Sequence, residues 1–314
     1  MRRAIFPGVV LVTAGVLVVA CGGGSKESSG FPATDAAGGG VDGTGGGQGG
    51  DSGFGSFTDG SPTFSDGGTI AQEAGAPVAI IYAHSADILY RLDATSKQVA
   101  VVGPFSGGCD SVIDIALDSN SNAYVTTAAG LWSLDLQTAA CSHIAGGSYP
   151  NSLSFVPKGT LDPNTEALVG YNGSTYIRIN TTTGAVQNVG ALTGGYTSSG
   201  DIVSVIGGGT FLTVKGGSAN CNDCLLQIDP KTGDLVQSYG SVNHVDVFGL
   251  AFWAGTAYGF DNGGQVFSIG WQNGTLTTTD IPVPNPPPGL AFWGAGSTTA
   301  APATAADGGG IPIQ

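Results

Sequence analysis

The feature that most constrains this fold is an internal repeat that begins near residue 78. An apolar segment ends in Asp or Asn in four of five copies, a Thr-containing turn follows in most copies, and a second apolar segment comes next. The copies lie at Leu89–Asp93, Leu131–Asp135, Tyr176–Asn180, Leu225–Asp229 and Val266–Gly270. They start 41 to 49 residues apart. Short β-branched and aromatic runs between Gly, Asn, Asp and Ser turns predict strands, and a period of about 40 to 45 residues is that of a four-stranded propeller blade.

A second repeated segment falls between the copies of the first and predicts the innermost strand of each blade. It occurs at Ile113–Leu117, Asn151–Phe155, Gly200–Ser204, Phe248–Phe252 and Pro288–Phe292. The last two copies share the sequence Gly-Leu-Ala-Phe-Trp, at Gly249–Trp253 and Gly289–Trp293.

The two ends of the repeat region complement each other. No hairpin follows Trp293, whereas the strands expected at Ala79–His84, Ile88–Asp93 and Gln98–Gly103 lack an inner partner. We predict that Gly289–Gly294 completes this first blade, because closure of the ring removes exposed sheet edges. The result is an all-β, five-bladed propeller over residues 77–297. A sandwich of repeated hairpins would leave the split repeat unexplained.

The N-terminus predicts export. Residues 1–20 contain Arg2 and Arg3 and an apolar run that is shorter than the roughly 20 residues of a membrane-spanning helix, which indicates a signal peptide. Val18–Cys21 resembles the lipobox of bacterial lipoproteins, and the resemblance implies that Cys21 is lipidated and becomes the new N-terminus. Gly22 is not the Asp that retains such proteins at the inner membrane, so the resemblance favours the outer membrane, facing the periplasm or the cell surface. An ordinary cleaved signal peptide is the alternative.

A glycine-rich tether is expected between the lipid and the propeller. From Gly22 to Gly75, 19 of 54 residues are glycine and aliphatic side chains are scarce, so residues 21–76 cannot form a core. A flexible chain of this length spans roughly 40 Å. Residues 298–314, rich in Gly, Thr, Ala and Pro, predict a disordered tail.

The charge of the chain limits its partners. Removal of residues 1–20 takes away two of nine basic residues and none of the 23 acidic ones, so the net charge changes from −14 to −16 with His neutral. Phosphate binding needs clustered Lys and Arg. Nucleic acid is therefore excluded as a partner, and we expect a monomeric propeller that reaches the membrane only through its lipid.

Four cysteines besides Cys21 predict disulfides. An even number in an exported chain suits an oxidising compartment, and four cysteines allow three connectivities. Cys221 and Cys224 suit a local bridge, which leaves Cys109 and Cys141 as the other pair, although their strand ends could lie on opposite faces of the ring. The Asp or Asn that closes the first repeated segment is expected to hold its turn by accepting backbone N–H groups.

The starting ends of the inner strands and the loops before them predict one binding mouth. We expect it to gather Asp110, Asp114, Tyr149, Asn151, Tyr196, Asp201, His244, Asp246 and Asn285. Among these, Asp114, Asn151 and Asp201 are candidate ligands of calcium, which prefers oxygen ligands. The alternative is that these groups cap strand ends and bind water, with no cofactor present.

Residues 78–296, with segments such as Leu225–Gly233, resemble the broad superfamily of NHL-like, PQQ-like and gluconolactonase-like propellers. Members include metal-dependent lactonases whose channel metal is held by Glu, Asn and Asp. The chain has only three glutamates, Glu27, Glu73 and Glu166, so that ligand set is not reproduced.

Two functions follow. The first is a non-catalytic binding or scaffolding module for a protein or a glycan. The alternative is a metal-dependent hydrolase or lyase that uses Asp114, Asn151, Asp201 and His244. No Gly-x-Ser-x-Gly or His-Glu-x-x-His motif is present, which favours the first.

Overall fold

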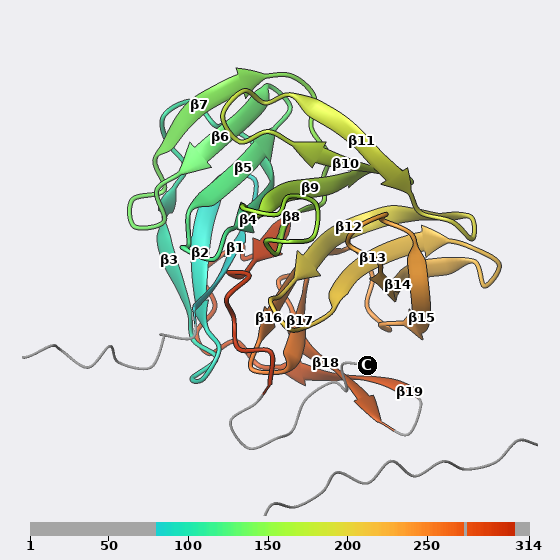
Figure 1. The fold of residues 1–314 in the computed structure, drawn as a ribbon. Helices are drawn as coiled ribbons and strands as arrows, with labels where there is room; N and C mark the ends of the chain where they lie inside the picture. The colour runs from blue at the N-terminus through green and yellow to red at the C-terminus, as the bar shows by residue number, and fades with distance from the viewer. Residues whose placement is uncertain (1–79, 273–274, 305–314) are drawn as a thin grey trace, which may run out of the picture. The chain divides into compact units, whose positions relative to one another are not determined.

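The computed structural model describes residues 80–272 and 275–304. Within these ranges, twenty strands form five antiparallel sheets of four strands each. Figure 1 shows the sheets arranged radially about a common centre, with β4, β8, β12, β16 and β20 innermost. The fold is therefore a five-bladed β-propeller, as predicted. No helix in the described ranges is long and apolar enough to cross a membrane. The signal segment, Cys21 and the tether lie outside the described residues.

Each blade uses strands that are consecutive in the chain, except the first. Blade 1 contains β1 (Ile80–His84), β2 (Ile88–Asp93), β3 (Val99–Pro104) and β20 (Gly294–Gly296). Blade 2 contains β4 (Val112–Leu117), β5 (Ala123–Thr127), β6 (Gly130–Leu134) and β7 (Cys141–Gly146). Blade 3 contains β8 (Leu153–Val156), β9 (Ala167–Asn172), β10 (Thr175–Ile179) and β11 (Val186–Ala191). Blade 4 contains β12 (Tyr196–Ser204), β13 (Thr210–Gly216), β14 (Cys221–Ile228) and β15 (Leu235–Ser241). Blade 5 contains β16 (Val247–Trp253), β17 (Thr256–Asp261), β18 (Val266–Gln272) and β19 (Thr275–Ile281).

Pairing of the two ends closes the ring. Strand β20 lies antiparallel to β1, with Ala83 opposite Ala295 and His84 opposite Gly294. Closure through the C-terminus was expected, but the strand expected at Gly289–Gly294 is wrong because pairing begins only at Gly294. Three prolines at 286–288 have no N–H to donate to a ladder. Phe292 instead fills the space between the rings of Tyr90 and Phe260.

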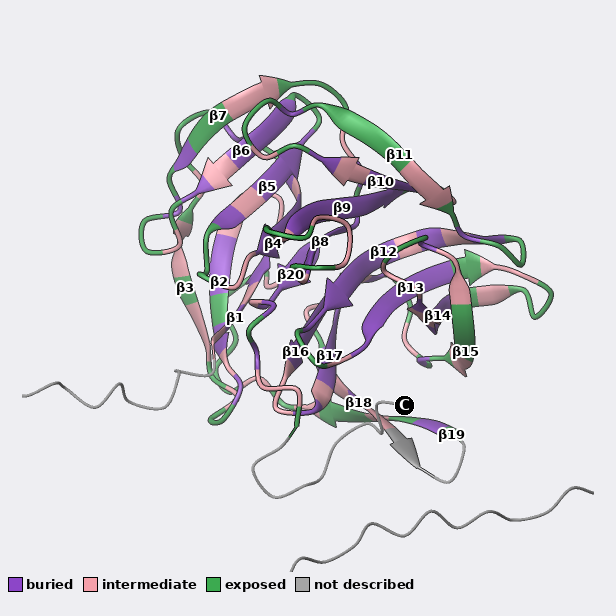
Figure 2. Cartoon of the chain, viewed as in Figure 1, coloured by how far each residue is buried: buried purple, intermediate pink, exposed green. Residues whose placement is uncertain are grey.

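The hydrophobic core lies between the blades. Five clusters of buried side chains are present in the described residues, and each joins one pair of neighbouring blades. Phe211 of blade 4, for example, packs in one cluster with Phe252 and Phe267 of blade 5. Figure 2 shows the inner strands largely buried and the outer strand β11 largely exposed. A blade therefore depends on both neighbours for the burial of its faces.

Two disulfides reinforce the ring. Cys109, which precedes β4, is bonded to Cys141 at the start of β7, and Cys221 is bonded to Cys224 in β14. The first bridge is possible because strands twist by about 20 to 25° at each step, which turns the outer strand of a blade away from its inner strand. The start of β7 then lies beside the segment before β4, where Cys141 N donates to Ser106 O at 2.9 Å.

The segment after β20 closes one end of the ring. We call residues 297–302 the axial plug. Its contacts reach blades 2 to 5, and they run from Thr298 to Asp118, from Thr299 to Glu166 and Ile206, from Ser297 to Phe252, and from Pro302 to Gly255. Thr299 is fully buried. The domain boundary expected at residue 297 therefore falls too early, because these small residues fit across the face on which the inner strands end.

Candidate functional site

Three polar side chains meet at the centre of the ring. His84 ends β1, Asp114 lies in β4 and Asp201 lies in β12, and all three are 0% exposed. A methyl group on Gly294 would lie less than 3.0 Å from both His84 Nε2 and Asp114 Oδ1. The closing strand must therefore have glycine here, since any side chain would occupy the space that these polar atoms share.

Backbone N–H groups hold the two carboxyl groups in place. Asp201 Oδ1 accepts from Ile202 N at 2.6 Å, and its Oδ2 accepts from Leu250 N of blade 5 at 2.8 Å. Asp114 Oδ1 accepts from Ile115 N at 2.8 Å. The two aspartates occupy equivalent repeat positions, as expected, and Asp201 joins two inner strands of neighbouring blades.

Two polar atoms at this centre are without a partner. His84 Nδ1 faces Ser85 O at 2.8 Å, whereas His84 Nε2 has no hydrogen bond. Asp114 Oδ2 also has none, and no other buried side-chain nitrogen or oxygen in the described ranges shares this condition. A buried polar atom without a partner is unfavourable by about 1 to 3 kcal/mol. The ring centre therefore holds two buried polar atoms whose hydrogen-bonding capacity the described residues do not satisfy.

Burial determines the charges at the centre. It raises the pKa of Asp114 well above its ordinary value, and the neighbouring charge of Asp201 raises it further. Burial also raises the pKa of Asp201 well above its ordinary value, although the N–H donors of Leu250 and Ile202 lower it. The pKa of His84 falls to about 4 because burial disfavours the charged imidazolium. At neutral pH His84 is therefore neutral.

These residues do not fit a calcium ion. Asp114 and Asp201 come together as expected, but Asn151 is exposed and stands apart from the sealed centre. Three of the four carboxyl oxygens already accept backbone N–H groups, while calcium takes six to eight oxygen ligands. In the described part of the chain, no three His, Cys, Asp or Glu side chains are grouped as metal ligands.

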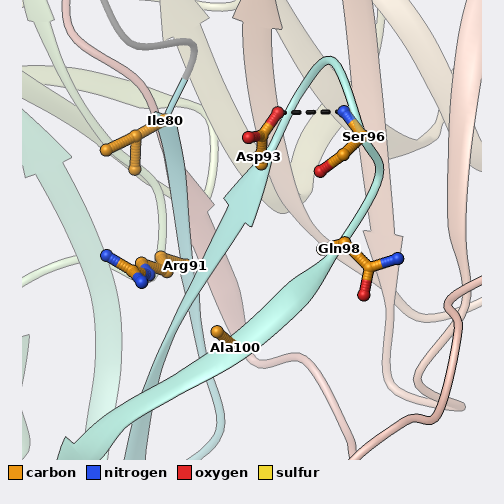
Figure 3. Close-up of a pocket in the computed structure, with 6 residues that line it drawn as sticks. All are labelled: Ile80, Arg91, Asp93, Ser96, Gln98 and Ala100. Carbon is orange, nitrogen blue, oxygen red and sulfur yellow. Dashed lines mark hydrogen bonds between the residues drawn. The ribbon is translucent and has the colours of Figure 1, made fainter.

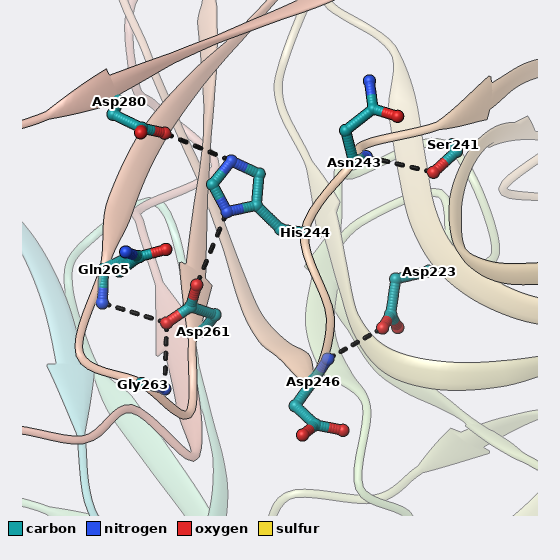
Figure 4. Close-up of polar contacts among 9 residues, drawn as sticks. All are labelled: Asp223, Ser241, Asn243, His244, Asp246, Asp261, Gly263, Gln265 and Asp280. Atoms are coloured by element: carbon teal, nitrogen blue, oxygen red, sulfur yellow. Dashed lines mark hydrogen bonds and ion pairs between the residues drawn. The ribbon is translucent and has the colours of Figure 1, made fainter.

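A second cluster lies in blade 5, beside the loop that leads into β16. His244 Nδ1 lies 3.5 Å from Asp261 Oδ2, and His244 Nε2 lies 3.3 Å from Asp280 Oδ1 (Figure 4). The imidazole stacks on the ring of Phe267, with centroids 3.7 Å apart. A surface hollow of about 710 Å³ opens here, with His244, Asp261 and Asp280 in its wall. Both ring nitrogens thus face carboxylates.

Backbone hydrogen bonds hold this cluster in place. Asp261 Oδ1 accepts from Gly263 N and Gln265 N, both at 2.9 Å. Asp246 has a φ of +55°, and its N–H donates to Asp223 Oδ2 at 2.9 Å (Figure 4). His244 and Asp246 therefore lie in one loop that a hydrogen bond to Asp223 holds in place. Asp261 and Asp280 could not be placed beside His244 by sequence reasoning, since both lie in strands outside the innermost ring.

The two tyrosines expected at the mouth have packing roles. Tyr149 OH donates to Gly184 O, in the turn between β10 and β11, at 2.9 Å. Tyr196 is buried in the cluster between blades 3 and 4 and covers Gly217. Neither ring is gathered with Asp114 and Asp201. Aromatic residues before an inner strand can equally fill the gap between blades, which sequence position alone does not separate.

Trp293 is a mouth residue that the sequence pattern concealed. It directly precedes β20, and its backbone N–H donates to His84 O at 2.7 Å. Its side chain is 42% exposed. Val245, before β16, is 63% exposed. The shared Gly-Leu-Ala-Phe-Trp sequence had placed Trp293 inside an inner strand. The shift of the strand to Gly294 brings the indole to the surface beside blade 5.

A second hollow lies on blade 1, but its polar side chains do not converge on one point. It measures about 260 Å³ and is lined by Ile80, Arg91, Asp93, Ser96, Gln98 and Ala100 (Figure 3). Asp93 Oδ1 accepts from Thr95 N and Ser96 N, so it holds the turn, as predicted. The turn and the hairpin that surround this hollow account for its shape.

No protein-family model matches the sequence, and neither does any curated protein. Among solved structures, similarity is found to Kuenenia stuttgartiensis hydrazine synthase, with 14% identity, 65% of this chain and 63% of that chain covered, and a TM-score of 0.37. A nidogen/laminin complex gives 10% identity, coverage of 69% and 97%, and a TM-score of 0.44. The Dos1 propeller gives 13% identity, coverage of 60% and 52%, and a TM-score of 0.34. Likeness at this level concerns the fold alone.

Proposed function

We propose that this chain is a lipid-anchored protein of the cell envelope whose propeller is a non-catalytic binding or scaffolding module. Its partner is a protein or a glycan, and it binds the face on which the inner strands begin. The lipobox-like sequence at Cys21 supports the anchor, and outer-membrane attachment is the form that Gly22 favours. The two disulfides suit a compartment outside the cytosol.

The accessibility of the two faces supports a binding surface rather than a reaction chamber. The axial plug crosses the face on which the inner strands end, and Asp114 and Asp201 are sealed inside. On the opposite face, Trp293 and Val245 are exposed. Asn151 is exposed before β8, and Asp246 is exposed before β16. The exposed indole of Trp293 carries the proposal, because Trp is enriched among the residues that dominate binding energy.

A metal-dependent hydrolase or lyase of the gluconolactonase-like type has one supporting observation. Buried Asp261 faces His244 Nδ1 and can orient the imidazole toward the hollow, as a general base requires. However, His244 Nε2 faces Asp280, and the axial residues expected to hold the cation already accept backbone donors. The binding module therefore remains our proposal.

Photocrosslinking of the full-length chain in the cells that make it tests the binding face. A photoreactive phenylalanine at Trp293 or Asn151 should give specific adducts. The same residue at Val101 or Val186 provides the control, since both are about half exposed on outer strands. A protein adduct will be sensitive to protease, and a glycan adduct will stain for carbohydrate. Equal adducts at all four positions, or none at the first two, would contradict the proposal.

A further inference from the structure

Polar atoms of two blades line the centre of the ring beside Gly294. The three heavy atoms nearest to the position of a methyl group on Gly294 are His84 Nε2, Asp114 Oδ1 and a ring carbon of His84. His84 Nε2 and Asp114 Oδ2 both lack partners and are completely buried. A buried water usually makes two to four hydrogen bonds to groups of this kind.

We propose that the ring axis is a buried binding site for one water molecule and one proton, shared by His84, Asp114 and Asp201 from three blades. The water donates to His84 Nε2, whose lone pair is free because Nδ1 carries the ring proton toward Ser85 O. It accepts from the carboxyl group of Asp114. Each of the two atoms without a partner then gains one.

The proton belongs on Asp114 rather than on Asp201. Two adjacent buried carboxyl groups cannot both remain charged, because repulsion and desolvation add. Asp201 accepts N–H groups from Ile202 and Leu250 with separate oxygens, and both bonds favour its charged form. Asp114 accepts from Ile115 through Oδ1 and keeps Oδ2 free to carry hydrogen.

The remaining elements around the site contribute no charge. Strands β8, β16 and β20 supply only apolar residues, serine and glycine. Apart from the tyrosines Tyr82 in β1 and Tyr196 in β12, His84, Asp114 and Asp201 are the titratable groups on the six strands that surround the centre. The site connects β1 of the closing blade with inner strands of blades 2 and 4. Occupancy of the site therefore contributes to closure of the ring between its two chain ends.

The site gives the stability of the ring a defined dependence on pH. The unfolded chain releases the Asp114 proton near its ordinary pKa of about 3.9, whereas burial keeps it bound in the folded chain. This contribution to stability is complete below about pH 4 and is lost as the pH rises through the raised folded pKa. His84 acts in the opposite sense. Its contribution is present above pH 6.5 and is lost as the pH falls through about 4.

Asp114→Asn and Asp201→Asn in the full-length chain test the assignment of the proton. Asn at 114 keeps an acceptor for Ile115 N and provides a permanent N–H donor in place of the proton. Between pH 5 and pH 9 the Tm of the Asp114→Asn chain should therefore be higher than that of the unmodified chain by roughly 2 to 4 °C. Asn at 201 directs an NH₂ group at a backbone N–H and should lower Tm across the whole range.

Asp110→Asn, an exposed carboxyl before the same strand, is the matched control and should leave the pH profile unchanged. Equal effects of the two buried substitutions, or an unchanged pH profile in Asp114→Asn, would overturn the proton assignment.

The water is tested without a substitution. The ¹⁵N shifts of His84 should show protonated Nδ1 and bare Nε2 down to pH 5, and a high-resolution crystal structure should show one water in contact with His84 Nε2 and Asp114. A His84 that titrates near pH 6.5, or a centre without that water, would overturn the site.

Discussion

The Asp or Asn at the end of the first repeated segment holds the turn that follows it, and it does so at the same position in successive blades. Asn180 Oδ1 accepts from Thr182 N and Thr183 N, both at 2.9 Å. In blade 2, Asp135 Oδ1 accepts from Gln137 N at 2.7 Å and from Thr138 N at 3.0 Å. These donors lower the pKa of Asp135. Carboxylate and amide oxygens are therefore interchangeable here, as the sequence predicted.

We predict that Asn180→Ala destabilises the folded chain by about 1 kcal/mol, because two backbone N–H groups lose their acceptor to exposed solvent. Tm should fall by roughly 2 to 4 °C in a thermal melt at neutral pH. Asn180→Asp is the matched control, since blades 1, 2 and 4 have Asp at this position, and it should keep the Tm of the unmodified chain. If the Asp variant melts as low as the Ala variant, the turn does not depend on this oxygen.

At the scale of strands, the period of the sequence predicted the blades but not the closing strand. Four inner strands coincide with their repeated segments because apolar residues there pack between sheets. The fifth copy failed because the ring centre accepts only small residues beside His84 and Asp114, a condition that exists only after the ring has closed. Because the start of this strand could not be predicted, the position of Trp293 at the mouth was missed as well. The same dependence on ring closure also made the axial plug resemble a tail of Thr, Ala and Pro.

Removal of the axial plug tests its role as a structural element. A chain that ends after Gly296 loses about five hydrogen bonds to four blades, together with buried Thr299 and Ala301. We expect it to be less stable by on the order of 3 to 5 kcal/mol, measured by urea unfolding. A chain that ends after Thr304 is the control and should match the full-length chain. Equal midpoints for the two truncations would contradict a closing role for residues 297–302.

At the scale of the whole molecule, the ring and its charge favour display on a tether. The five clusters join every blade to both of its neighbours, so the hydrophobic core runs around the whole ring. A net charge of −14 for the full sequence opposes attraction to anionic headgroups. Attachment to a membrane must then come from hydrophobic insertion rather than from the surface of the ring. The sequence offers Cys21 for this purpose.

Cys21→Ser should therefore move the protein from the membrane fraction to the soluble fraction. A lipid chain contributes about 0.8 kcal/mol for each buried CH₂ group, and the acidic ring supplies nothing to replace it. Fractionation by ultracentrifugation, with immunoblotting of both fractions, measures the change. Cys221→Ser with Cys224→Ser is the control, because it also replaces cysteines, here a disulfide pair, but leaves the lipobox-like sequence intact, and it should stay with membranes. Retention of Cys21→Ser in the membrane fraction, after a high-salt wash, would show that another part of the chain provides the anchor.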